Sequence, residues 1–317
     1  MRFSVIVPVH NSEAYLHRSL DSLVSQSYIP YEVILVNDHS TDKSREICEK
    51  YAEEYAFIYV VDSSGIGVSA ARNTGLGLAS GEIITFCDAD DFEEKDAFEA
   101  VNNIFLKNKE VSVVVAGYYD VEEASLSKLK LNAVNSFSQG IYSAEEVACH
   151  VLYDGNFMGS VWNKFFRRES IRNIHFDTNL SMCEDAHFVV QVLTATYNRE
   201  AYVYVSSIPT YNYVQNLSST SRSINKIFNK NGISNFSIAY SRIADLPTVT
   251  PKIRKVADYV NFKSSANFWI RRDIPKKYKP ELMKNCRRKR KAFIQLFKLD
   301  KWNNIKMVIR LCIAAIS

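Results

Sequence analysis

Short apolar runs alternate with helical stripes along the first 120 residues of the chain. The run at 3–9 is almost continuously apolar, as expected for a strand that is buried on both faces. Apolar residues then recur at helical spacing, at positions 16, 20, 23 and 24. A regular succession of strands and helices is typical of a parallel α/β sheet. The pattern predicts strands at 3–9, 31–36, 58–61, 83–87 and 111–116, with helices that start near residues 16, 41, 69 and 95.

The pattern is less regular after residue 120. A polar segment at 122–135 predicts a loop, and from residue 224 the chain is helical and increasingly basic. Between these segments, the spacing of apolar and β-branched residues predicts two helices, at 143–152 and 185–196, and two strands, at 201–206 and 210–214. We therefore expect an α/β sheet followed by a helical C-terminal region.

Composition excludes several classes of protein. Hydrophobic residues make up 47% of the chain and charged residues 23%, which excludes a disordered or collagen-like chain. The six cysteines form no C-x-x-C pair and have no metal-ligand spacing, which favours reduced thiols. No run reaches the ~18 consecutive apolar residues of a membrane span, and the first residues resemble a strand more than a signal peptide. We expect a cytoplasmic protein.

The net charge of +4 hides an asymmetry along the chain. Residues 1–100 contain 7 basic and 18 acidic side chains, which gives a net charge of −11. Residues 251–317 contain 19 basic and 4 acidic side chains, which gives +15. The acidic part is suited to a bound cation and the basic part to an anionic partner.

Polar residues follow three of the predicted strands. His10 and Asn11 follow the first, Asn37 and Asp38 the second, and the Asp-Ala-Asp-Asp sequence at 88–91 the fourth. Ligands of open parallel sheets bind beyond the carboxyl ends of the strands, so these groups are expected to share one site. Each group alone is equally consistent with a helix cap or a solvated turn.

Glycine-rich phosphate-binding motifs are missing from the sequence. It contains neither G-x-G-x-x-G after the first strand nor G-x-x-x-x-G-K-[ST], which argues against a nicotinamide-dependent or P-loop enzyme. Asp88 and Asp90 offer another way to hold a nucleotide, through a hard divalent cation that prefers oxygen ligands and shares them with a diphosphate. An Asp-x-Asp triplet by itself is also a common charged turn.

Four motifs in this order resemble the family 2 inverting glycosyltransferases, which have the GT-A fold. They are Ser-Val-Ile-Val-Pro-Val-His-Asn at 4–11, Val-Asn-Asp-His-Ser-Thr-Asp at 36–42, Ala-Arg-Asn-Thr-Gly at 71–75 and Phe-Cys-Asp-Ala-Asp-Asp at 86–91. Trp-Asn-Lys at 162–164 and Cys-Glu-Asp at 183–185 continue the series. The resemblance implies a GT-A catalytic domain at 1–215, with a nucleotide-binding half at 1–120 and an acceptor-binding half at 121–215. It leaves a helical region at 216–317.

The resemblance also implies roles for single residues. Asp38 is expected to accept the N3 hydrogen of uracil, with Pro8, His10 and Asn11 lining the base and ribose pocket. Arg72 is expected to brace the nucleotide through a base carbonyl or a phosphate.

The remaining carboxylates are assigned to the metal and to the reaction. Asp88 is expected to contact the ribose and the metal region, and Asp90 to ligate Mn²⁺ or Mg²⁺ directly. Asp185 is expected to be the general base. Four further residues are expected near the acceptor or the donor sugar: Asp91, Trp162, Lys164 and Glu184. The alternative reading of Trp162 is a core residue, and that of Glu184 and Asp185 is an acidic first helical turn.

The basic segment at 284–317 combines Arg-Arg-Lys-Arg-Lys with apolar and aromatic residues. This composition is typical of a helix that lies on an anionic membrane surface. A nucleic-acid patch and a solvated helix are the alternatives, and no stacking motif or binding fold supports nucleic acid.

The expected function is metal-dependent transfer of a hexose or N-acetylhexosamine from a UDP-sugar to a hydroxyl of a lipid-linked bacterial surface glycan of the capsule, exopolysaccharide or lipopolysaccharide type. The enzyme is expected in the cytoplasm, peripheral at the inner face of the plasma membrane. The alternatives are a sugar nucleotidyltransferase and a non-catalytic glycan-binding relic.

Overall fold

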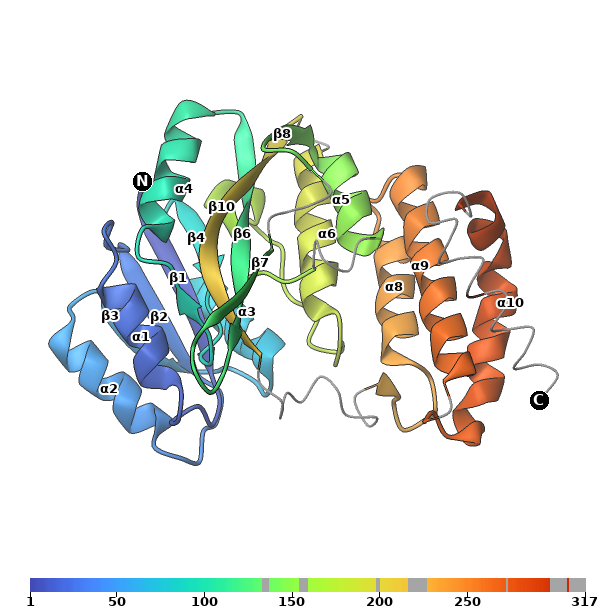
Figure 1. Ribbon diagram of the computed structural model, residues 1–317, viewed down its shortest axis with the longest axis horizontal. Coiled ribbons are helices and arrows are strands. Elements are labelled where there is room, and N and C mark those ends of the chain that lie inside the picture. The colour runs from blue at the N-terminus through green and yellow to red at the C-terminus, as the bar shows by residue number, and fades with distance from the viewer. Residues whose placement is uncertain are drawn as a thin grey trace.

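The computed structural model describes residues 1–132, 137–153, 159–197, 200–215, 227–271, 273–296 and 307. The described chain forms a mixed sheet covered by helices, with a group of helices at one end (Figure 1). The predicted α/β sheet and helical C-terminal region are both present.

The sheet runs in the order β3-β2-β1-β4-β9-β6-β10-β5, with β7 paired to β6 and β8 to β10. Strands β1 to β4 are parallel to one another, β6 and β10 are also parallel, and β9 is antiparallel to both β4 and β6. The strands are β1 (Phe3–Val9), β2 (Glu32–Asn37), β3 (Ile58–Asp62), β4 (Ile83–Phe86), β5 (Phe92–Glu93), β6 (Val111–Glu122), β7 (Lys128–Asn132), β8 (Gly140–Ser143), β9 (Lys164–Arg167) and β10 (Tyr202–Gln215).

Helices cover both faces of the sheet. The larger ones are α1 (Leu16–Val24), α2 (Ser44–Glu54), α3 (Val68–Leu78), α4 (Ala97–Lys107), α5 (Ala144–Tyr153), α6 (Glu184–Tyr197), α8 (Asn235–Asp245), α9 (Pro251–Ile270) and α10 (Lys279–Leu296). Two short 3₁₀ helices, η1 (Arg168–Ser170) and η3 (Lys276–Tyr278), precede the loop to α6 and the start of α10.

The alternation of side chains along β1 produces two apolar clusters. Val5 and Val7 pack into the cluster on the α1, α2 and α4 face, while Ile6 packs into the cluster on the α3, α5 and α6 face. Both faces of the sheet at β1 are therefore covered by apolar side chains. This explains why polar and apolar residues do not alternate in the run at 3–9.

The C-terminal helices continue the second of these clusters. Ile243 of α8 and Ile253 of α9 are fully buried in the cluster that contains Phe188 of α6. Helix α10 packs on α9 through Phe262 and Phe293, whose ring centroids are 4.3 Å apart. The domain boundaries predicted at residues 120 and 215 stay predictions.

One predicted loop is wrong. Residues 128–132 form β7. Strand β6 continues to residue 122, and the chain then turns back so that β7 pairs antiparallel with β6. The polar side chains of β7 do not predict a strand because four of its five residues face solvent. Residues 133–135 lie outside the described residues.

Among the described helices, none is both long and apolar enough to cross a membrane. The five cysteines of the described chain are free thiols, as predicted. Cys312 lies outside the described residues.

Candidate functional site

The carboxyl ends of β1, β2 and β4 lie together, because β1 is hydrogen-bonded in parallel to both neighbours. The segments that follow these strands bring Asn11, Asp38 and Asp88 to one edge of the sheet. A fourth contribution comes from α3, which starts after β3 and carries Arg72. The predicted convergence of polar residues on this edge is confirmed.

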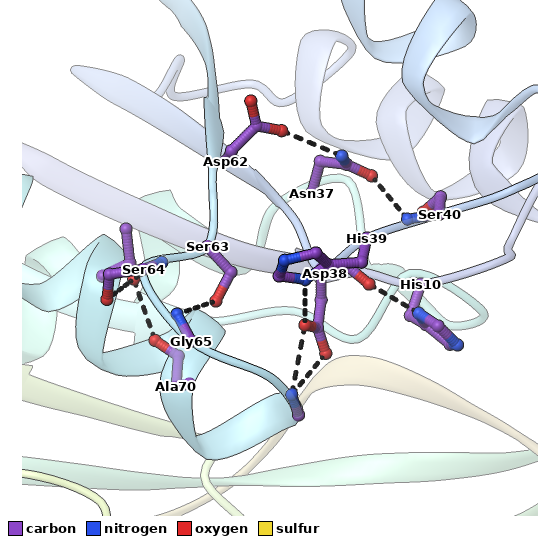
Figure 2. A network of polar contacts seen from close by, with 12 residues as sticks. His10, Asn37, Asp38, His39, Ser40, Asp62, Ser63, Ser64, Gly65 and Ala70 are labelled. Carbon is purple, nitrogen blue, oxygen red and sulfur yellow. Dashed lines mark hydrogen bonds and ion pairs between the residues drawn. The ribbon is translucent and has the colours of Figure 1, made fainter.

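Asp38 anchors the loop before α3 (Figure 2). Its side chain is almost fully buried, and its two carboxylate oxygens accept the N–H of Gly67 at 3.1 and 2.9 Å. Gly67 has φ +95°, a conformation that glycine adopts without strain, and no atom lies within 4 Å of the position of a Cβ there. Asp38 therefore fixes the start of α3, and its predicted contact with uracil stays a prediction.

His10 and Asn11 tie the end of β1 to the loop after β2. The Nδ1 of His10 lies 2.6 Å from the carbonyl oxygen of Asp38, and since a carbonyl only accepts, this nitrogen carries the proton. Asn11 has φ +48° and accepts the N–H of Thr41 at 2.8 Å through its side-chain oxygen. Both side chains are exposed and Pro8 beside them is half-buried, so the predicted base and ribose pocket has an accessible wall.

Arg72 links carboxylates from two distant parts of the chain. Its Nη1 donates to Oδ1 of Asp185 at 2.5 Å, and its Nη2 donates to Oδ1 of Asp88 at 3.0 Å. The side chain of Arg72 is 4% exposed, and its guanidinium lies 5.4 Å from the ring centroid of Phe176. Glu184 adds a third carboxylate, 3.7 Å from Nη1. One buried cation thus holds the predicted base and one carboxylate of the Asp-x-Asp motif in the same site.

Burial dominates the ionisation of Asp185. It raises the pKa of this carboxyl to about 7, although the charge of Arg72 opposes the shift, and the neighbouring charges of Glu184 and Asp88 add to it. A carboxylate with a pKa near neutrality is a suitable proton acceptor at physiological pH.

Asp90 is short of positive charge. Burial and the charge of Asp88 raise its pKa to about 6, and a backbone hydrogen bond and the charge of Arg18 offset this shift only in part. Arg18 donates to the backbone oxygen of Asp90, at 2.5 Å. Asp88 is paired with Arg72, and the two neighbouring carboxylates Asp88 and Asp90 are the oxygen ligands that a divalent cation prefers. No group of three His, Cys, Asp or Glu side chains in the described chain could hold an ion by itself.

Two predicted sugar contacts are directed into the protein instead. The oxygens of Asp91 accept the hydroxyl of Tyr211 at 3.0 Å and the N–H of Val214 at 2.7 Å, which attaches the end of the motif to β10. Trp162 is 4% exposed and stacks on Tyr211, with ring centroids 4.5 Å apart. Both side chains are therefore structural here, and we correct the expectation that they face a sugar.

Lys164 is fully buried beneath the site. Its Nζ donates to the backbone oxygen of Ser160 at 2.6 Å and to Oδ1 of Asn163 at 2.8 Å. Burial lowers the pKa of Lys164 to about 7, and the charge of Asp185 opposes this shift. The predicted contact of Lys164 with a donor diphosphate stays a prediction.

A family model described as "Glycosyl transferase family 2" matches residues 4–174, more than half of the chain. The chain belongs to glycosyl transferase family 2. This assignment confirms the resemblance predicted from the motifs.

Curated relatives match somewhat more than half of the chain. Glycosyltransferase GlyA of Streptococcus pneumoniae is 33% identical over 187 residues, 56% of this chain and 26% of GlyA. The minor teichoic acid biosynthesis protein GgaB of Bacillus subtilis is 36% identical over 197 residues, 61% of this chain and 21% of GgaB. The chain thus spans about a quarter of these two relatives.

The solved structure of S. aureus TarS 1-349 in complex with UDP-GlcNAc matches 92% of this chain and 81% of that fragment. The TM-score is 0.72 and the identity 21%, so the similarity concerns the fold. The match confirms the predicted GT-A fold, and the predicted helical C-terminal region is present in the structure.

Two residues of the site were missed by the sequence motifs. Tyr211 accepts the N–H of Asp88 at 3.0 Å and donates to Asp91, so β10 braces the Asp-x-Asp turn. The N–H of Gly67 donates to the carboxylate of Asp38. A glycine just before a predicted helix was the available signal for Gly67; Tyr211 stands in an ordinary strand pattern and gave none.

Proposed function

We propose that the protein transfers a hexose or N-acetylhexosamine from a UDP-sugar to a hydroxyl group of a lipid-linked bacterial surface glycan, with inversion at the anomeric carbon. The observation that supports this proposal is the double contact of Arg72 with Asp185 and Asp88, which are the proposed base and the proposed nucleotide-side carboxylate. The name of GgaB, which refers to teichoic acid, and the UDP-GlcNAc in the TarS complex support the choice of acceptor and donor classes.

In the proposed reaction Asp185 accepts the proton of the acceptor hydroxyl. That oxygen forms a bond to the anomeric carbon as the bond to the diphosphate oxygen breaks, and UDP leaves from the opposite face. Arg72 holds Asp185 in place and balances its charge before the proton arrives. Glu184, 3.7 Å from the same guanidinium nitrogen, orients this end of the site.

Asp88 and Asp90 are the residues that would hold the divalent cation, Mn²⁺ or Mg²⁺. When bound, such a cation offsets the negative charge that develops on the departing diphosphate. Asp38 provides an acceptor for the N3 hydrogen of uracil beside its contact with Gly67, since a carboxylate has about four acceptor positions.

A panel of UDP-sugars with Mn²⁺ tests the proposal, with UDP release as the readout. Asp185→Asn should lower the rate by two or more orders of magnitude, because general-base catalysis contributes about 10²–10⁴-fold. Asp90→Asn and a chelator should each remove activity. Wild-type rates in Asp185→Asn would refute the base, and wild-type rates with chelator would refute the cation. UDP release from no donor at all would favour the non-catalytic alternative.

We further propose that the basic segment of α10 attaches the enzyme to the cytoplasmic face of the membrane. Arg287, Arg288, Arg290 and Lys291 are exposed, while Lys289 forms an ion pair with Asp258 at 2.5 Å. The remainder of the predicted segment, apart from Met307, lies outside the described residues.

Vesicle sedimentation tests this attachment, since exposed basic residues contribute about 1 kcal/mol each near an anionic surface. The full-length protein should sediment with phosphatidylglycerol vesicles and not with phosphatidylcholine vesicles. Replacement of the four exposed residues by Gln should abolish the difference. Equal sedimentation of this variant and the wild type would refute the role of α10.

A further inference from the structure

A hollow of about 530 Å³ lies at one end of the C-terminal helices, between the turn at 229–232 and η3. Its lining includes Asn229, Lys230, Asn231, Lys277 and Tyr278. This volume is in the range of ~300–1,000 Å³ that is usual for small-ligand sites. None of these residues belongs to the catalytic site described above.

The wall of the hollow is a tight turn with a fixed shape. Phe228 and Ser234 form an antiparallel bridge, and Asn229 accepts the N–H groups of Asn231 and Ile233 at 3.0 and 2.9 Å through its side-chain oxygen. Gly232 closes the turn with φ +75°, and a Cβ at this position would lie 3.3 Å from the ring of Tyr278. A larger residue at 232 would therefore strain the turn and press on the wall opposite.

The lining combines aromatic and cationic groups. Tyr278 stacks on Phe228 with ring centroids 4.2 Å apart, and Nζ of Lys277 lies 4.9 Å from the centre of the Tyr278 ring. Lys230 and Lys277 are both exposed, and no carboxylate is among the lining residues that the structure describes. The hollow is thus positively charged at its rim.

Neighbouring acids do not neutralise this rim. Asp273 forms an ion pair with Arg271, and Glu281 pairs with Lys284 at 3.2 Å. Lysines that remain available to solvent bind phosphate groups as point charges, and aromatic and amide side chains suit the apolar faces and hydroxyl groups of sugar or polyol units.

The hollow is connected to the loop that carries the base. Phe228 and Tyr278 belong to an apolar cluster that also contains Met182, three residues before Asp185. In Figure 1, α6, α8 and α10 each have one end on the lower side of the view. Helix α6 begins at its lower end, and its first two residues are Glu184 and Asp185. A chain bound in the hollow would approach the catalytic site from the side of the base, where the acceptor must enter.

We propose that this hollow binds a phosphate-bearing segment of the acceptor, a glycan whose sugar or polyol units are joined by phosphodiesters. This inference rests on the proposed function for the identity of the acceptor. The lysines hold the phosphate groups, and the hollow keeps the chain in register with Asp185 during transfer.

Direct binding to the full-length protein tests the site without relying on catalysis. The probe is a short synthetic glycerol-phosphate oligomer, measured by isothermal titration calorimetry against an uncharged glucose oligomer and inorganic phosphate. Lys230→Gln/Lys277→Gln should weaken binding of the charged oligomer about ten-fold, as expected for the loss of two exposed charge pairs. A matched control, Lys109→Gln/Lys255→Gln, removes two exposed charges elsewhere on the surface and should leave binding unchanged.

In transfer assays with a phosphodiester acceptor, the same double variant should raise the acceptor KM and leave kcat unchanged. Equal affinity of the double variant and the wild type would refute the site. Tighter binding of the uncharged oligomer would refute the charge argument, and phosphate that binds as tightly as the oligomer would reduce the hollow to an anion site. If the protein transferred no sugar, the calorimetric result would still decide whether the hollow binds the oligomer.

Discussion

Replacement of Arg72 by Met is the sharpest test of how the site is held together. Among the described residues, Arg72 is the only cation within hydrogen-bonding distance of both Asp185 and Asp88, and the change removes it. The two carboxylates then stay mostly buried, since the side chains of Asp185 and Asp88 are 19% and 28% exposed. With charge centres about 4 Å apart and an effective dielectric constant of about 20, each pair contributes ~4 kcal/mol before desolvation. Removal of one partner of a buried pair costs about 3–5 kcal/mol, and we expect Arg72→Met to lower the free energy of unfolding by that amount at pH 8.

A double-mutant cycle separates the pair from the general effect of each change. The free energies of unfolding of the wild type, Arg72→Met, Asp185→Asn and the double variant are measured by urea denaturation with tryptophan fluorescence. We expect a coupling energy of about 1.5–3 kcal/mol, since contacting residues in one network are non-additive. Arg45→Met and Asp62→Asn form the matched control, because that ion pair is exposed and should couple by less than about 1 kcal/mol.

The pH dependence of the cycle has a definite sign. The pKa of Asp185 is raised to about 7 in the folded protein, so between about pH 4 and pH 7 the folded state holds a proton that the unfolded state has released. The free energy of unfolding of the wild type should therefore fall as the pH rises from about 4 to about 7, and Asp185 contributes up to about 1.4 kcal/mol per pH unit to this fall. Asp185→Asn should lack this contribution. A coupling energy no larger than that of the exposed control pair would show that Arg72 does not hold Asp185. Identical pH slopes in the wild type and Asp185→Asn would show that the pKa of Asp185 is not raised in the folded protein.

Three further predictions concern the same fold. The kcat/KM of the wild type should decline about ten-fold per pH unit below about pH 7, because Asp185, the proposed base, becomes protonated there; a plateau down to pH 5 would exclude this role. Gly75→Ala should lower the free energy of unfolding by about 1–3 kcal/mol, since the new Cβ would lie 2.4 Å from Ile6. Gly77→Ala on the same helix meets open space and should raise the free energy of unfolding by about 0.5–1 kcal/mol. Urea midpoints in the opposite order would contradict this packing. Burial and the charge of Asp91 raise the pKa of Glu93 well above its usual value. Glu93→Gln should therefore become more stable relative to the wild type as the pH rises above about 4.5. If urea titrations gave the same difference in unfolding free energy at every pH, Glu93 would not be protonated in the folded protein.

The parts of the fold that depend on apolar periodicity were predictable from the sequence. The strand predicted at 3–9 has the bounds of β1, and the helix predicted at 185–196 differs from α6 by one residue at each end. The segment β7 was not predictable, because a strand with one partner and mostly exposed side chains has the composition of a loop. The single strand β10 was predicted as two, since Pro209 and the register shifts beside it interrupt the alternation.

The site was predictable as a set of residues and less so as a set of contacts. The motifs indicate that Asp88, Asp185 and Arg72 share a site, and the hydrogen bonds confirm that they do. The motifs do not indicate that Arg72 forms ion pairs with carboxylates of the protein itself. The contact between Arg72 and Asp185 joins residues 113 positions apart, and such a contact is determined by the fold. Trp162 shows the same limit: its position in the motif is clear, but its direction depends on where Tyr211 of β10 passes.

The buried charges around the Asp-x-Asp turn show why the proposed cation suits this site. Burial raises the pKa values of Asp90, Asp91 and Asp185, and Arg72 is the cation that bonds to two of the carboxylates at this edge of the described chain. A fold stabilised only by its own contacts would be expected to pair or remove such groups, and local rules of this kind are usually broken at functional sites. Asp91 accepts the hydroxyl of Tyr211 and a backbone N–H of β10, whereas Asp90 lies close to the charge of Asp88, with the charge of Arg18 as partial compensation. A divalent cation at Asp88 and Asp90 would therefore offset negative charge that burial and proximity make unfavourable here.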